Sequence, residues 1–94
     1  MFIILLKPGQ NRVHAASFME GHKSWLEQGM EEGTFLLWGS MKQGGGAILA
    51  AAGDLDALKA RLDMDPFVAE QIVSVEIIEL APARAVEQLS FLLA

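Results

Sequence analysis

One histidine in this sequence is spaced so that it falls within the packing face of a helix. At about 100° per residue, His22 lies on the same stripe as Phe18, Trp25 and Leu26. An imidazole held there loses hydration, which favours its neutral form and leaves a nitrogen lone pair for general base catalysis. A core histidine satisfied by a backbone carbonyl or by water is an equally good interpretation. His14, at the edge of the stripe, is expected to be partly buried and to have no special role.

Two further polar residues could take part in chemistry, and each has an ordinary structural alternative. Asp65 precedes Pro66 and Phe67, a pattern typical of a helix N-terminus, so capping is its simplest role. Ser40 ends a predicted strand, where its hydroxyl could bond a ligand or its own turn. The glycines of Gly44–Gly46 are not followed by a helix or by Gly-Lys-Ser/Thr, so they predict a flexible hairpin lip and not a phosphate-binding loop.

The composition excludes several classes of function. The chain has no cysteine, which removes disulfides, thiolate metal ligands and a cysteine nucleophile, and we expect neither a metal site nor a cofactor. Its net charge is −5 and its 7 basic residues are scattered, whereas nucleic-acid binding needs a clustered positive face. The apolar start, Met1–Leu6, is too short to span a membrane. We therefore expect no nucleic acid, no membrane association and a cytoplasmic location.

The hydrophobic pattern predicts alternating strands and helices within one domain. Strands are predicted at Phe2–Leu6, Thr34–Met41, Ala47–Ala52 and Ile72–Leu80. A helix is predicted from Arg12 to Glu32, and a second, two-piece helix follows Asp54 and restarts at Asp65-Pro66. The order βαββαβ closes into a ferredoxin-like α+β fold, a four-stranded antiparallel sheet with both helices on one face.

The predicted sheet leaves one apolar face without a cover. Just over half of the residues are apolar, and the strands carry apolar side chains on both faces. A bare face of this size favours packing against a second copy, so we expect a homodimer through the sheet face. After the domain at residues 1–80, Val86, Leu89 and Leu93 recur at helical spacing. We expect the tail, residues 81–94, to form a short helix on its own body or on the partner.

The order and spacing of several short motifs resemble the YCII-related (YciI-like) family, from about Phe2 to Leu80. The motifs are His22 with Trp25-Leu26, Gly33 before Phe35-Leu36, Gly39-Ser40, Gly45-Gly46-Ala47-Ile48-Leu49-Ala50, Asp65-Pro66-Phe67 and Glu76-Ile77-Ile78-Glu79. The resemblance implies a dimeric α+β barrel with a pocket between helix and sheet that is centred on a histidine and an aspartate. These two residues carry over to His22 and Asp65.

The resemblance also implies a chemistry, because the family is associated with dehydrochlorination of hydroxylated chloro-aromatics and is similar in architecture to muconolactone isomerases. Both reactions move a proton beside a carbonyl or an enol. In a cofactor-independent lyase or isomerase of this kind, His22 would be the general base and Asp65 would orient its ring. Ser40 would hold the substrate oxygen of a small organic substrate. The other expected contacts to the substrate are Trp25, Trp38 and Phe67.

Some features depart from the family and keep other functions open. Some relatives have an Arg three positions before the histidine, where this chain has Met19, which weakens the expectation of an anionic substrate. Many relatives have a Gly within the segment that reads Val68-Ala69-Glu70-Gln71 here. The alternative is a non-catalytic module for small-molecule binding or dimerisation. A cofactor-free oxygenase of the same architecture ranks last, because Asn11 is the only Asn available for its pocket.

Overall fold

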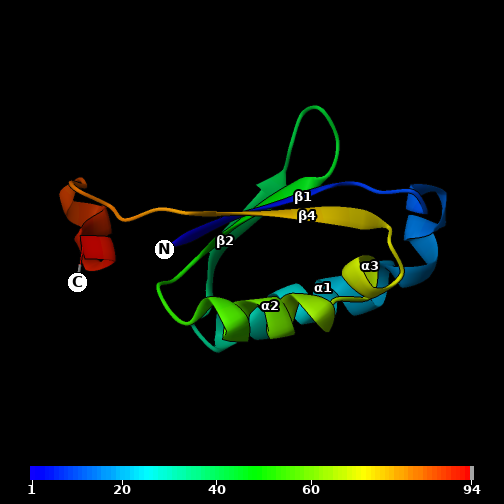
Figure 1. Cartoon of the computed structure of the whole chain (residues 1–94), viewed down its shortest axis with the longest axis horizontal. Helices are drawn as coiled ribbons and strands as arrows, with labels where there is room; N and C mark the ends of the chain where they lie inside the picture. Colours follow the sequence, from blue (N-terminus) through cyan, green and yellow to red (C-terminus); the bar gives the residue numbers. More distant parts are fainter. Residues whose placement is uncertain (94) are drawn as a thin grey trace.

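Four antiparallel strands form the sheet of this protein, which we describe from a computed structural model covering residues 1–93 (Figure 1). They lie in the order β2-β3-β1-β4, so the two central strands are the first and third in the chain. Their bounds are β1 Phe2–Pro8, β2 Phe35–Ser40, β3 Gly46–Ala50 and β4 Val73–Glu79. This order and direction confirm the ferredoxin-like α+β fold.

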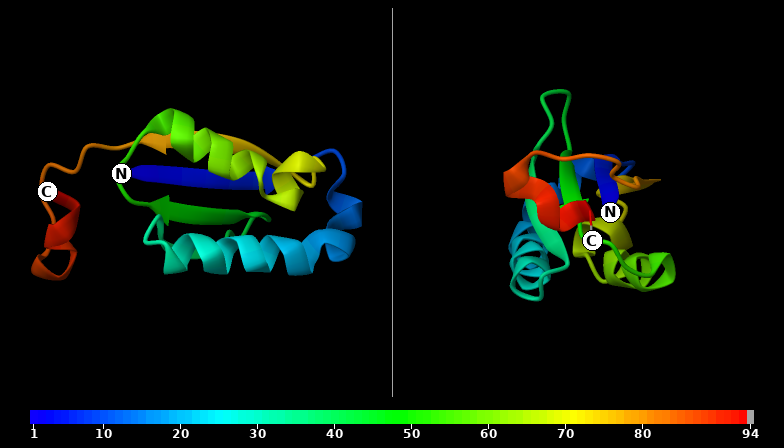
Figure 2. Two further views of the ribbon diagram at one scale, coloured as in Figure 1. Left: turned by 90° about the horizontal axis from the view of Figure 1, so that it is seen from below. Right: turned by 90° about the vertical axis from the view of Figure 1, so that its left-hand side faces the viewer.

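The helices form a second layer on one face of the sheet (Figure 2). The long helix α1, Ala15–Glu31, follows a short 3₁₀ turn, η1, at Arg12–His14. The second crossover is split into α2, Leu55–Asp63, and α3, Pro66–Ala69, as the restart at Asp65-Pro66 predicts. Gly33 ends α1 with a φ of +77°, a conformation that favours glycine after a helix C-terminus.

The structure corrects the predicted beginning of the first helix and the end of the first strand. Because residues 12–14 form a 3₁₀ turn, His14 lies outside α1 and is exposed, not partly buried. Strand β1 continues to Pro8, which pairs with Val73 of β4. Proline is tolerated there because the other neighbour, β3, pairs with β1 only as far as Leu6 and needs no amide donor from Pro8.

Alternation along β1 places the core between the sheet and the helices. In β1, Phe2, Ile4 and Leu6 are buried, with Ile4 fully inaccessible. They pack with residues of the other strands and the helices: Trp25, Leu26, Phe35, Ile48, Ala50, Leu58, Leu62, Phe67, Ile72 and Val73. Gly29 of α1 leaves room for the ring of Phe35, which a Cβ at that position would overlap. The close approach of helix and strand thus explains a glycine that weakens the helix itself.

The opposite side of the sheet is the free sheet face, and none of the helices in residues 1–93 covers it (Figure 2). The register pairs Ile3 with Leu49 and with Ile78, and Leu37 with Leu49, so these side chains share that face. Leu5 belongs to the same face by alternation. Leu37 is 55% exposed and Ile78 is 40% exposed. The expectation of an uncovered apolar face is therefore met in the single chain.

Residues 81–93 of the tail make no substantial contact with the body of the described chain. After β4 it runs beyond the end of the sheet and finishes in a 3₁₀ helix, η2, at Glu87–Leu93, apart from both layers (Figures 1 and 2). The predicted helix is therefore present as a 3₁₀ segment, and none of the substantial contacts between elements involves it. A domain boundary at residue 80 stays a prediction, and Ala94 lies outside the described residues.

Candidate functional site

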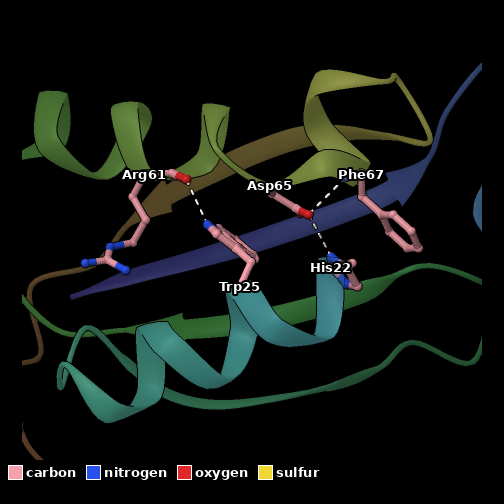
Figure 3. Close-up of polar contacts among 5 residues, drawn as sticks. All are labelled: His22, Trp25, Arg61, Asp65 and Phe67. Atoms are coloured by element: carbon pink, nitrogen blue, oxygen red, sulfur yellow. Dashed lines mark hydrogen bonds and ion pairs between the residues drawn. The ribbon is translucent and has the colours of Figure 1, made fainter. Parts of the chain in front are cut away.

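Helix α1 directs His22 toward the junction of α2 and α3. Its side chain is 12% exposed, and its Nδ1 lies 2.9 Å from Oδ1 of Asp65, whose side chain is completely buried (Figure 3). A carboxylate oxygen accepts, so Nδ1 carries the hydrogen in this pair. In the neutral ring the remaining nitrogen, Nε2, then has the lone pair that a general base needs.

Asp65 serves two functions with one oxygen. Its backbone is extended, with φ −72° and ψ 122°, and its Oδ1 accepts a hydrogen bond of 3.0 Å from the amide of Phe67. This is N-capping of α3, as the Asp-Pro pattern predicts. The same Oδ1 accepts from His22, so capping and pairing coexist. The second oxygen, Oδ2, is buried and has no hydrogen-bond partner among the described residues.

Aromatic neighbours fix the plane of the His22 ring. The ring of Phe67 is parallel to it within 4°, with centroids 3.9 Å apart. The indole of Trp25, one turn along α1, lies 6.1 Å away at an angle of 23°. In Figure 3 the imidazole lies between these two side chains. Stacking and the Asp65 hydrogen bond together hold the ring in one orientation.

A cavity of about 490 Å³ lies beside His22, between α1 and the β2–β3 hairpin. Four of the predicted site residues line it, namely His22, Trp38, Ser40 and Phe67. Trp38 and Ser40 share the face of β2 that points toward the helices, because Trp38 pairs with the buried Ile48 and Ser40 with Gly46. Asp65 does not line this cavity. It supports the histidine from the protein interior.

Trp25 was predicted to contact the substrate, but its side chain does not line the His22 cavity. Its Nε1 donates a 2.9 Å hydrogen bond to the carbonyl of Arg61, and its ring meets Phe35 edge to face. It lines a second cavity of about 610 Å³ between α1 and α2. The side chains of Arg61 and Glu32 at that cavity bind each other at 2.7 Å. The larger cavity therefore has no histidine, and its charged pair is already satisfied.

Three features of the His22 cavity were not among the predicted site residues. Lys23 and Met19 line it from α1, and Gly45-Gly46 line it from the hairpin. Lys23 is the cationic residue of the lining, next to His22 in the chain, and no carboxylate is part of that lining. Lys23 is exposed, and its position on α1, about 100° from His22, does not by itself predict a place beside the cavity. Gly45 has a φ of +79° and lies against the carbonyl of Leu6, which explains a glycine at this lip.

Among the described residues, the pKa of Glu32 at the end of α1 is shifted from its ordinary value. The hydrogen bond from Arg61, with a further one from Gln28, lowers the pKa of Glu32 below its ordinary value of 4.5. Within residues 1–93, no group of three or more metal-ligating side chains comes together. The absence of a cofactor stays a prediction.

The membrane prediction has a limited structural test. None of the described helices is both long and apolar enough to span a bilayer. A cytoplasmic location stays a prediction.

Comparison with solved structures finds a similar fold. One solved structure with this fold is that of 5-chloro-2-hydroxyhydroquinone dehydrochlorinase (TftG) from Burkholderia phenoliruptrix AC1100, in complex with 2,5-dihydroxybenzoquinone. The TM-score is 0.66 over 85% of this chain and 93% of that chain, at 13% sequence identity. A likeness at this identity establishes the fold alone.

Comparison of sequences gives the family. None of the curated proteins compared with this chain matches it. The family model of the YCII-related domain, however, matches residues 1–81, which is most of the chain. The match extends from the first strand through the end of β4 and includes the His22–Asp65 pair. The chain therefore belongs to the YCII-related family.

Proposed function

We propose that this protein is a cofactor-independent lyase or isomerase that moves a proton on a small hydroxylated ring compound. The observation that carries the proposal is the 2.9 Å hydrogen bond between His22 Nδ1 and Asp65 Oδ1, beside a cavity of about 490 Å³. Asp65 orients the imidazole and stabilises its protonated form, and Nε2 exchanges the proton. The dehydrochlorinase with a similar fold, which binds a dihydroxybenzoquinone, supports this class of substrate.

For a chlorinated hydroxyhydroquinone, two proton transfers account for the reaction. His22 Nε2 first accepts the proton of one ring hydroxyl. The electron pair of that bond forms a carbonyl, and the ring carbon that carries chlorine takes up a proton. A second hydroxyl then loses its proton, and the electrons move through the ring to expel chloride. One proton and one chloride leave in sum, and the ring reaches the quinone level because two electrons depart with chlorine.

The other lining residues have simple roles in this proposal. The hydroxyl of Ser40 donates a hydrogen bond to a substrate oxygen on which negative charge develops. Trp38 and Phe67 provide flat apolar walls for a ring. Trp25 is assigned to positioning, since it stacks near His22 without lining the cavity.

The direct test is chloride release from 5-chloro-2-hydroxyhydroquinone under anaerobic conditions, with double-bond migration in unsaturated lactones measured in parallel. His22→Gln should lower the rate by roughly 10²- to 10⁴-fold, the usual contribution of a general base. His14→Gln is the matched control, because His14 is exposed and does not line the cavity. Its rate should equal that of the wild type.

Two results would overturn the proposal. If the His22→Gln protein retains its circular dichroism spectrum and the wild-type rate, His22 is not the base. If the wild type binds 2,5-dihydroxybenzoquinone but turns over none of the compounds, the non-catalytic binding module is the better description. Loss of folding in His22→Gln would instead assign His22 a structural role in the core.

We also propose that the protein is a homodimer through the free sheet face. Ile3, Leu37, Leu49 and Ile78 present a continuous apolar surface there, and burying it stabilises association. Because Leu37 is 55% exposed in the single chain, Leu37→Asp should leave folding unchanged and weaken self-association in sedimentation equilibrium. Unchanged self-association of the folded variant would contradict this interface.

A further inference from the structure

The tail is the second apolar surface that this chain leaves uncovered. Of the large hydrophobic side chains that are exposed, four lie in residues 81–93: Val86 at 64%, Leu89 at 44%, Phe91 at 58% and Leu93 at 46%. Figures 1 and 2 show the tail beyond the end of the sheet, away from the helices. No described residue of the tail is part of the lining of the His22 cavity. A single chain thus exposes two separate apolar surfaces, the free sheet face and the tail.

The local structure of the tail needs a packing partner. The 3₁₀ helix η2, Glu87–Leu93, has seven residues, whereas runs longer than about four are uncommon because the hydrogen-bond geometry is poor. Segments of this length are not stable in water without tertiary contacts. Within residues 1–93, none of the substantial contacts between elements joins η2 to its own body, so η2 is open to a packing surface from another molecule.

The distribution of charge favours a second copy as that molecule. The tail carries one cation, Arg84, and one anion, Glu87. The free sheet face carries Lys7 and Glu76, which bind each other at 2.5 Å. Both surfaces are therefore neutral, although the whole chain has a net charge of −5. Two copies can bring these surfaces together without the repulsion that their net charge would otherwise cause.

We propose that each chain of the homodimer packs its tail, residues 81–93, against the sheet of its partner. A two-fold axis makes every such contact twice, so each copy both donates a tail and receives one. The apolar side chains of η2 then cover the rim of the partner's free sheet face, next to the sheet–sheet contact. The inference rests on the homodimer proposed above and is independent of the chemistry at His22.

Cross-linking between isotopically different chains tests the exchange of tails. Because the chain has no cysteine, Leu89→Cys provides a unique thiol for a benzophenone maleimide. The modified chain is mixed with an excess of unmodified ¹⁵N chain, equilibrated, illuminated and digested for mass spectrometry. Tail peptides should be joined to ¹⁵N peptides from the strands. Lys59→Cys, labelled in the same way on the exposed surface of α2, should give no such products.

The possible results of this experiment distinguish the proposed tail exchange from the proposed sheet-face dimer. Cross-links only within one chain, in a protein that is still dimeric, would overturn tail exchange and leave the sheet-face dimer intact. A protein that is monomeric at all concentrations would overturn both. Neither result bears on chloride release, which tests the chemistry separately.

A pair of double variants tests the energetic contribution of the tail. Leu89→Asp with Phe91→Asp removes two exposed apolar side chains, and Gln88→Asp with Ser90→Asp adds the same charge to the same segment without removing any. The first pair should raise the dimer dissociation constant at least about tenfold more than the second. Because all four residues are exposed in the single chain, circular dichroism should be unchanged. Equal dissociation constants for the two double variants would contradict the proposal.

Discussion

Oδ1 of Asp65 accepts a hydrogen bond from Nδ1 of His22 at 2.9 Å while it caps α3 through the amide of Phe67 at 3.0 Å. Two residues separated by 43 positions in the chain are thus joined through an atom that also fixes a helix terminus. The orientation of the ring consequently depends on the packing of α1 against the α2–α3 junction.

Asp65→Asn separates the capping role from the charge. The amide oxygen can still accept from Phe67, but the new NH₂ group must occupy the site of Oδ2, where no described residue offers an acceptor. We expect a loss of about 1–3 kcal/mol in unfolding free energy, with the fold retained. Turnover should fall by roughly 10²- to 10⁴-fold, because a neutral amide does not stabilise the imidazolium. Urea unfolding and chloride release measure the two effects, and full activity would contradict the role of the carboxylate.

Lys23 should favour anionic ligands of the His22 cavity. It is the cation among the lining residues, and 2,5-dihydroxybenzoquinone is a vinylogous acid that is anionic at neutral pH. Lys23→Met should weaken binding of this compound by up to about fivefold, the range of an exposed ion pair, with the difference shrinking at high salt. Isothermal titration calorimetry provides the measurement. Lys59→Met, which does not alter this cavity, should bind as the wild type does, and an equal loss in both variants would contradict a local role.

Substitution by alanine should change the stability of the protein differently at two glycines of α1. A Cβ at Gly29 would overlap the Phe35 ring, whereas a Cβ at Gly21 would lie 3.1 Å from Cγ of Pro66 at the protein surface. Gly29→Ala should destabilise the protein by about 1–3 kcal/mol through overpacking, despite the higher helix propensity of alanine. Gly21→Ala should be nearly neutral, since a gain of up to about 1 kcal/mol offsets a tight contact. Equal unfolding free energies for the two variants would contradict this packing.

The Glu32–Arg61 ion pair between α1 and α2 should make stability depend on pH in the acid range. Arg61 lowers the pKa of Glu32 in the folded state, so the folded protein binds this proton less readily than the unfolded chain. The stabilisation is therefore complete above the ordinary pKa and is lost as the pH falls through the lowered folded value. Thermal unfolding of wild type and Glu32→Gln from neutral to acid pH measures it. The difference between them should shrink with falling pH, and a constant difference would contradict the ion pair.

Much of the fold follows from local patterns. The apolar runs at Phe2–Leu6 and Val73–Glu79 identify two strands, although Phe2–Leu6 is apolar on both faces and does not show which face meets the helices. The stripe around Trp25 and Leu26 defines which side of α1 is buried. The same stripe places His22 inward, and Asp65-Pro66 predicts the break between α2 and α3. These features depend on neighbours in sequence, so a single sequence carries them.

The remaining features depend on contacts between distant segments. Trp25 shares the stripe of His22, yet its indole turns toward the carbonyl of Arg61 in the last turn of α2, which also accepts from the amide of Met64. Lys23 lines the cavity although its helical position points toward solvent, because a long side chain can cover a neighbouring opening. The tail has apolar residues at helical spacing, but within residues 1–93 it makes no substantial contact with the other elements. Periodicity identifies a face that needs a partner and does not identify the partner.

The state of the His22 ring is the property on which the proposed activity depends most directly. Long-range ¹H–¹⁵N NMR of ¹⁵N-histidine-labelled protein at neutral pH distinguishes the two ring nitrogens and the protonation of each. We predict that the hydrogen of the neutral ring lies on Nδ1 in the wild type, and that addition of 2,5-dihydroxybenzoquinone shifts the Nε2 resonance while that of His14 stays unchanged. A ring protonated at Nε2 alone, or an Nε2 resonance that does not respond to the ligand, would contradict the assignment of His22 as the base.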